Sequence, residues 1–258
     1  LLIVAVVAWL VVYPPAQGPP KIKIALVTWV GFGPFYVAQD KGYFREEGLN
    51  VQLVRIDDFG ARRGAMAAGE LDGSFETVDA LAVCLAENLP AAAILVVDQS
   101  YGGDGIVANK GIANIAGLKG KTVACAKSTP SHFFLLYLLD QQGLSPRDFT
   151  FQPMEAGDAG AAFVAGKVDC AVTWEPWLSR AKTTPHGHVL ATTKEYPGII
   201  ADTFVVHPRF AKNRPEDVKA ILRAWFKATE YLRDHPAEAA AIMAKHLELP
   251  AEELDAML

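Results

Sequence analysis

The chain has 258 residues, of which 51% are hydrophobic and 21% are charged, and its formal net charge is -5. This composition predicts one large or two modest folded domains and excludes a largely disordered chain. The acidic balance, with neither an arginine stripe nor a basic helix in the sequence, argues against a nucleic-acid partner.

An uncharged apolar run opens the chain from Leu1 to Tyr13, and a Pro- and Gly-rich stretch follows it up to Pro20. The run is short for a bilayer span and typical of a signal-peptide core. We therefore interpret residues 1–20 as an export signal or membrane anchor with a linker; the alternative is a buried core segment. We expect a basic leader to be missing from this sequence. The final residues, AEELDAML, indicate C-terminal truncation as well.

Strand and helix patterns alternate along the chain. The first set comprises strands at 21–27, 51–56, 71–75 and 92–97 and helices at 34–41, 61–68 and 78–87. The second set comprises strands at 121–126, 149–154, 168–172 and 189–192 and helices at 131–142, 158–165 and 176–182. The β-rich sequence TFVVHP follows from Thr203, and then helices are expected at 215–234 and 236–246. This alternation predicts an α/β fold with largely parallel sheets.

One segment of the first set recurs in the second. The stretches that begin at Gly48 and Gly143 share a Gly-Leu, a strand, a helix ending in Ala-Gly, an Asp three residues after that Gly and an apolar strand. The match pairs Gly69 with Gly166 and Asp72 with Asp169, and it places Thr77 on Trp174. A chance match is the alternative, because Ala-Gly-x-x-Asp is a common turn, but the shared order favours two related lobes.

The repeat defines the expected domain organisation. Lobe 1 is expected at 21–107 plus 203–258, because the last helices have no counterpart between the repeats and would pack back on it, and lobe 2 at 108–202. The chain would then cross near Val107–Lys110 and near Gly198–Asp202. Two crossings between α/β lobes make a hinge around a cleft in which a ligand binds.

The three cysteines, Cys84, Cys125 and Cys170, are isolated in sequence. An odd count without a CxxC motif predicts buried free thiols, with a Cys125–Cys170 disulfide as the alternative. No metal site or cofactor is expected.

The segment from Gly31 to Phe44 (GFGPFYVAQDKGYF), followed by Glu47-Gly48-Leu49, resembles the opening of solute-binding proteins of the sulfonate, taurine and nitrate class of ABC importers. The resemblance continues through AAGELD, LKGKTV, GKVDCA and Trp174-Glu175-Pro176, and covers roughly residues 21–258. It implies a periplasmic binding protein-like type II fold, two α/β lobes joined by a two-crossing hinge. It also implies an exported protein that binds a small-molecule solute and delivers it to an ABC permease in the membrane. We expect a monomer in the periplasm, or anchored outside the cytoplasm.

In such folds the ligand meets loops at the carboxyl ends of strands, and these loops supply the candidate ligand-binding residues. In lobe 1 they are Trp29, Phe32, Glu76, Thr77, Asp98 and Asp104. In lobe 2 they are Ser128, Thr129, Ser131, Trp174 and Glu175. Each has a structural alternative. Trp29 is as readily a core residue, Asp98 and Asp104 as readily cap a turn, Ser128 and Thr129 are common helix N-caps, and Glu175 can cap the helix that follows it.

The carboxylates near the expected cleft favour an amine-bearing solute over nitrate or a plain sulfonate. Trp174 and Trp177, which flank Glu175, are suited to a cation or an apolar tail. No GxSxG, HExxH, P-loop or dinucleotide motif is present, so no catalytic residue is predicted. One alternative is a biosynthetic enzyme of the same fold, such as a thiamine-pyrimidine synthase relative, whose Cys-rich motif is missing here. Another is the effector domain of a regulator.

Overall fold

The computed structural model describes residues 18–250, 253–254 and 257. The apolar run at 1–13, and with it the predicted signal or anchor, lies outside the described residues. Within them, no helix combines the length and the apolar character that a membrane crossing requires.

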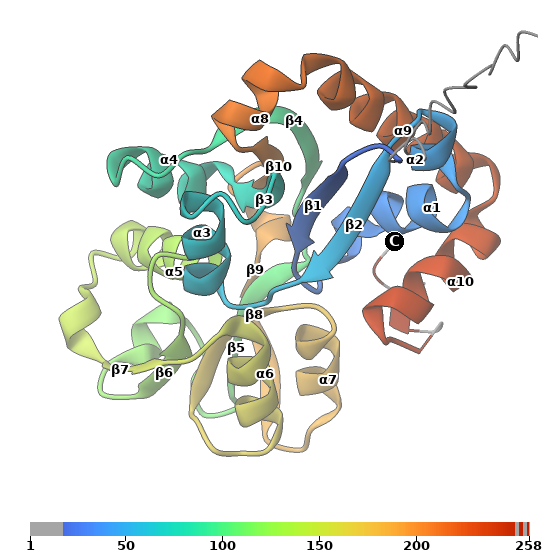
Figure 1. The fold of residues 1–258 in the computed structure, drawn as a ribbon. Coiled ribbons are helices and arrows are strands. Elements are labelled where there is room, and N and C mark those ends of the chain that lie inside the picture. The colour runs from blue at the N-terminus through green and yellow to red at the C-terminus, as the bar shows by residue number, and fades with distance from the viewer. Residues whose placement is uncertain (1–17, 251–252, 255–256, 258) are drawn as a thin grey trace, which may run out of the picture.

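The first of two five-stranded sheets has the strand order β2-β1-β3-β10-β4 (Figure 1). Its strands are β1 (Lys21–Leu26), β2 (Asn50–Arg55), β3 (Gly73–Thr77), β4 (Ala92–Gln99) and β10 (Ala201–Val206). The elements associated with it are the 3-10 turn η1 (Val30–Phe32) and helices α1 (Gly33–Asp40), α2 (Tyr43–Glu46), α3 (Phe59–Ala67), α4 (Val78–Ala86), α8 (Pro208–Asn213), α9 (Pro215–Asp234) and α10 (Pro236–Leu247).

The second sheet has the matching order β7-β6-β8-β5-β9. Its strands are β5 (Asp104–Asn109), β6 (Thr122–Cys125), β7 (Thr150–Pro153), β8 (Cys170–Trp174) and β9 (Gly187–Thr192). Its helices are α5 (Pro130–Gln141), α6 (Ala156–Val164) and α7 (Trp177–Thr183). The α/β class and the two-lobed architecture are as predicted.

The expectation of largely parallel sheets was wrong. In the first sheet, β10 runs antiparallel to both β3 and β4. In the second, β5 runs antiparallel to both β8 and β9. The reason is topological: each antiparallel strand is the first one formed after the chain crosses from the other sheet, and it enters from the opposite end.

The first crossing also lies earlier than predicted. All of β5 pairs in the second sheet, so residues 104–107 do not belong with lobe 1, and the chain passes between the sheets at residues 100–103. Gly102, which has φ +91°, belongs to this connection. The second expected crossing, 198–202, overlaps the connection that leads into β10 at Ala201.

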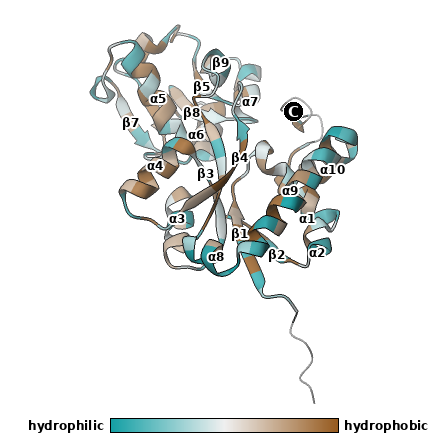
Figure 2. Ribbon diagram, turned by 90° about the horizontal axis from the view of Figure 1, so that it is seen from above, coloured by the Kyte–Doolittle hydropathy of each residue, from teal (hydrophilic) through white to brown (hydrophobic). Residues whose placement is uncertain are grey.

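The last helices pack back on lobe 1, as predicted from their lack of a counterpart, with α1 as their main neighbour. Helix α9 buries one side of its surface, which includes Ile221 and Trp225, in the same core as Phe35 and Phe204. Figure 2 shows the hydrophobic and hydrophilic residues that alternate along this helix. A stripe at this spacing is what a helix lying on a sheet requires.

The sequence repeat corresponds to real structural equivalence. Asp72 Oδ2 accepts a hydrogen bond from the Lys23 N–H at 2.9 Å, and Asp169 Oδ2 accepts one from the Thr122 N–H at 3.2 Å. Asp72 therefore links β1 to the turn before β3, and Asp169 links β6 to the turn before β8 in the same way. The paired glycines Gly69 and Gly166 both adopt positive φ, +72° and +70°, which is the reason for glycine there.

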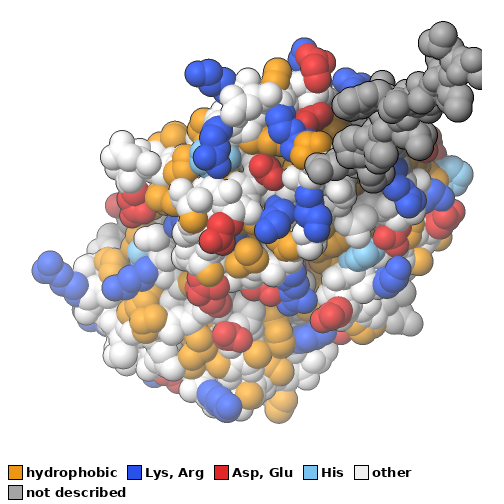
Figure 3. All heavy atoms as spheres, viewed as in Figure 1, with side chains coloured by type: hydrophobic (Ala, Val, Ile, Leu, Met, Phe, Trp, Pro, Cys, Tyr) orange, Lys and Arg blue, Asp and Glu red, His pale blue; other side chains and the backbone are white. Residues whose placement is uncertain are grey.

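The three cysteines are buried free thiols, so the alternative Cys125–Cys170 disulfide is not formed. Among the described residues, no group of three or more His, Cys, Asp or Glu side chains is arranged to hold a metal ion. On the face shown in Figure 3, acidic and basic side chains are interspersed rather than gathered by sign.

Candidate ligand-binding cleft

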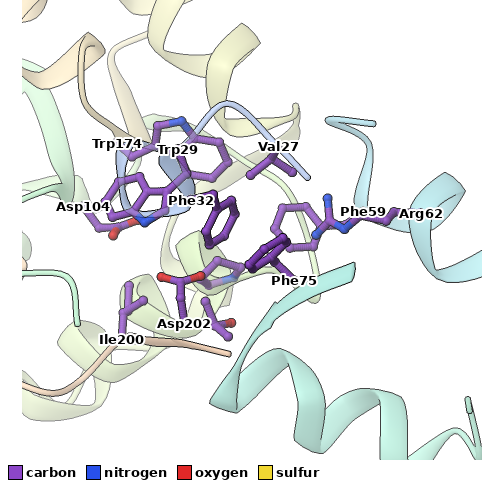
Figure 4. A pocket seen from close by; sticks show the side chains of 12 residues that line it. Val27, Trp29, Phe32, Phe59, Arg62, Phe75, Asp104, Trp174, Ile200 and Asp202 are labelled. Atoms are coloured by element: carbon purple, nitrogen blue, oxygen red, sulfur yellow. The ribbon is translucent and has the colours of Figure 1, made fainter. Parts of the chain in front are cut away.

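A central cavity lies between the two sheets, next to both chain crossings (Figure 4). Its free volume in this structure is about 30 Å³, room for roughly one or two water molecules, so the side chains around it are closely packed. The lining side chains come from both lobes: Val27, Trp29, Phe32, Phe59, Arg62, Phe75, Thr77, Asp104, Pro130, Trp174, Ile200 and Asp202.

Aromatic rings form most of the wall. Phe32 stacks on Phe75 with ring centroids 4.0 Å apart, and both residues are buried. Trp29 lies just after β1 and Trp174 is the last residue of β8. Their rings line the cavity from the two lobes (Figure 4). Walls of this kind suit an apolar chain or a cation held against a ring face.

Two carboxylates, Asp104 and Asp202, face the same cavity from opposite sheets. Asp104 opens β5 and pairs across the ladder with Trp174, the last residue of β8. Asp202 lies in β10 and pairs with Thr77, the last residue of β3. Because Thr77 and Trp174 are equivalent in the repeat, Asp104 and Asp202 are equivalent too, and each lobe presents one acid at the same place.

Burial controls the protonation of these acids. It raises the pKa of Asp104 to about 7, although a hydrogen bond with Ser100 acts in the opposite direction. Burial, and then the charges of Asp98 and Asp104, raise the pKa of Asp202 well above its ordinary value. A carboxylate removed from water without a cationic partner retains its proton more tightly.

Asp98 contacts Trp29 rather than the central cavity. Its Oδ2 accepts a hydrogen bond from Trp29 Nε1 at 3.1 Å. A Cβ on Gly31 would lie 1.8 Å from that oxygen, and a Cβ on Gly103 would lie 2.6 Å from Cη2 of Trp29, so glycine is required at both positions. Asp98 lines an outer pocket of about 380 Å³, which Trp29 also lines.

Glu76 does not face the cavity. Its side chain is 4% exposed and accepts a hydrogen bond from Arg63 at 3.1 Å, and its other oxygen lies 3.7 Å from Arg62. Strand alternation turns Glu76 away from the side that Thr77 faces, so the prediction that it meets ligand is not supported. Arg62 does line the cavity, on the side opposite Asp104 (Figure 4), and its Nε has no hydrogen-bond partner among the described residues.

The predicted residues at the start of α5 do not line the cavity, and one of them caps the helix. Thr129 caps the helix by accepting from the His132 N–H at 3.4 Å and donates to the Ala126 carbonyl at 2.8 Å. Ser128 is exposed, has φ +58°, and lines a different pocket from the central cavity. Ser131 is buried and its Oγ has no partner among the described residues, but only Pro130 of this turn lines the cavity.

Glu175 is also a cap rather than a cavity residue. Its carboxylate accepts hydrogen bonds from the Ser179 N–H and hydroxyl, each at 2.9 Å. It lies at the rim of the outer pocket. Of the eleven predicted residues, the cavity brings together Trp29, Phe32, Thr77, Asp104 and Trp174.

Asp202 and Arg62 are the charged cavity residues that sequence reasoning missed. A signal for Asp202 exists: Asp-Gly-Ile-Val at 104 and Asp-Thr-Phe-Val at 202 both open an apolar strand just after a crossing. Arg62 carries no comparable signal, because it is one of two adjacent arginines and only the helix geometry decides which of them faces inward.

Comparisons with known proteins agree with this architecture. A family model described as "NMT1/THI5 like" matches residues 29–239. A putative aliphatic sulfonates-binding protein of Bacillus subtilis is 29% identical over 214 residues, which are 80% of this chain and 64% of that protein. The taurine-binding periplasmic protein of Escherichia coli is 25% identical over 213 residues, 81% of this chain and 66% of that protein.

Two further matches define the breadth of the group. A 4-amino-5-hydroxymethyl-2-methylpyrimidine phosphate synthase of Aspergillus parasiticus is 25% identical over 223 residues, 80% of this chain and 64% of that protein. The structure of the alkanesulfonate-binding protein SsuA from Xanthomonas axonopodis superposes with a TM-score of 0.79 at 22% identity, over 94% of this chain and 84% of that one. This likeness shows the periplasmic binding protein fold.

The matched segments span about two thirds of the length of these curated relatives. The family match, by contrast, extends over most of the present chain, from Trp29 to Ala239. The chain belongs to the NMT1/THI5-like family.

Proposed function

We propose that the protein is the extracytoplasmic solute-binding component of an ABC importer and that it captures a small, amine-bearing organic solute in the central cavity. The observation that carries the proposal is the charge of the lining: Asp104 and Asp202 are both buried there, one from each lobe. An ammonium group between them would satisfy both acids, and the aromatic walls would hold its carbon chain.

Arg62 extends the proposal to a solute with an acidic group at its other end. Its guanidinium is 1% exposed, shares Glu76 with Arg63, and lies across the cavity from Asp104. A sulfonate or carboxylate on that side could accept from the unpartnered Nε. The charges of an aminosulfonate such as taurine therefore match the two ends of the cavity, whereas nitrate leaves both acids without a partner.

The relatives named for sulfonate and taurine binding support an importer, and we infer an ABC permease as the membrane partner and a monomer outside the cytoplasm. The alternative is an enzyme, and the similarity to the pyrimidine phosphate synthase of Aspergillus parasiticus supports it. The described lining residues include no Ser, Cys or His, and the two relatives named as binding proteins support binding without turnover.

Isothermal titration with taurine, propanesulfonate, ethylamine and nitrate tests the proposal. We expect taurine to bind more tightly than propanesulfonate, and Asp202→Asn to weaken taurine binding at least tenfold while changing propanesulfonate binding little. Asp140→Asn, which removes an exposed carboxylate on α5, is the matched control and should bind as the unaltered protein does. Tight binding of nitrate alone, or turnover of a bound solute, would overturn the proposal.

A further inference from the structure

Three aspartates gather where the two lobes join. Asp98 and Asp202 are cross-strand partners in the first sheet, and Asp104 begins the second sheet directly after the first crossing. The Ser100 hydroxyl accepts the Asp104 N–H at 3.1 Å, which fixes Asp104 close to the end of β4. We call Asp98, Asp104 and Asp202 the hinge acids.

The hinge acids have no cation beside them among the described residues. The charged groups that act on Asp202 are all carboxylates, those of Asp98, Asp104 and Asp79 at the start of α4. The same holds for Asp104, on which Asp98 and Asp79 act. The arginine that lines the cavity, Arg62, is on the opposite side and is already paired with Glu76.

A second observation indicates that a polar ligand group belongs here. Thr77 is 4% exposed, lines the cavity, pairs in register with Asp202 and is the N-cap residue of α4. Its Oγ1 makes no hydrogen bond of good geometry among the described residues, although it lies close enough to the Asp79 carboxyl to lower the pKa of that acid. A buried hydroxyl without a well-formed hydrogen bond costs free energy, and a donor or acceptor on a solute in the cavity would offset that cost.

In this structure the lobes meet around the cavity. Arg180 of α7 forms a 2.8 Å ion pair with Glu253 beyond α10, and α4 contacts α5. In this arrangement Asp104 and Asp202 are buried, 5% and 7% exposed. Burying a carboxylate charge without a partner is strongly unfavourable, whereas burying a protonated acid or an acid paired with a cation is not.

We propose that positive charge at the hinge acids controls closure of the cleft: the lobes close over an ammonium group or over bound protons, and ionised, unpaired hinge acids keep them apart. This inference rests on the proposed solute-binding function and adds its trigger. The inference also accounts for the equivalent acids in the two lobes, because closure would bury Asp104 and Asp202 together.

The test uses the protein without any solute. Small-angle X-ray scattering at about pH 5 and about pH 9 measures its radius of gyration, and circular dichroism confirms that it stays folded. We expect the radius to be smaller at the lower pH and larger at the higher, with the change centred near the pKa of Asp104, about 7. Asp104→Asn should expand less than the unaltered protein, because only Asp98 and Asp202 are left to ionise, and Asp140→Asn should respond as the unaltered protein does.

An unchanged radius of the unaltered protein between these pH values would overturn the inference, and so would an Asp104→Asn variant that expands as the unaltered protein does. Asp202→Asn provides a second neutral variant if Asp104→Asn does not fold. Because no solute is present, a failed amine titration would count against the proposed ligand class and leave this result intact.

Discussion

At the residue scale, Gly31 decides whether Trp29 can form the cavity wall. Its missing side chain leaves room for the bond between Trp29 Nε1 and Asp98 Oδ2. We predict that Gly31→Ala displaces the indole and weakens solute binding at least tenfold, as measured by isothermal titration. Gly64→Ala in α3, where an added Cβ meets nothing within 4 Å, is the control. It should bind normally and be slightly more stable, because alanine favours a helix interior. Equal affinities of the two variants would contradict this role for Trp29.

Which residues would face the cavity was predictable only in part. The last residues of two equivalent strands, Thr77 and Trp174, follow from the sequence repeat, and both line the cavity. Glu76 was misplaced because neighbouring strand residues point to opposite faces and the sequence does not show which face is inside. Glu175 and Thr129 were ambiguous for another reason. An acid or hydroxyl at a helix start makes the same pattern whether it caps the helix or meets a ligand, and here both cap.

At the scale of elements, Asp72 and Asp169 are equivalent ties between neighbouring strands of the two sheets. We predict that Asp72→Ala and Asp169→Ala each lower the free energy of unfolding by about 1–2 kcal/mol, because each loses a charge-assisted hydrogen bond to a backbone N–H. Urea denaturation measures the loss. Glu70→Ala, which changes an exposed acid close to Asp72, should cost much less. A large loss in only one lobe would contradict the equivalence.

The order of helices and strands was predictable because each has its own hydrophobic period and end signals, as α9 and its initial proline show. Strand direction was not. β5 was overlooked because Gly102 and Gly103 indicate a turn, which hides the strand that begins at Asp104. β10 pairs with β3 and β4, which lie more than one hundred residues earlier in the chain. No local sequence pattern predicts a pairing over that distance.

At the scale of the whole molecule, the proposed solute recognition and the proposed lobe movement both involve Asp104 and Asp202 beside the two crossings, so proton and solute should compete. The raised pKa of Asp104, about 7, means that this acid is largely protonated below that pH and must release its proton to pair with an ammonium group. We predict that affinity for an amine-bearing solute falls by up to about tenfold per pH unit below about 7, and that binding at about pH 6 releases protons. Titration calorimetry in buffers of different ionisation enthalpy measures this release. Asp104→Asn should flatten the pH dependence of taurine affinity, and the affinity for propanesulfonate should not fall with pH. A taurine affinity that does not change with pH in the unaltered protein would show that the hinge acids do not bind the solute.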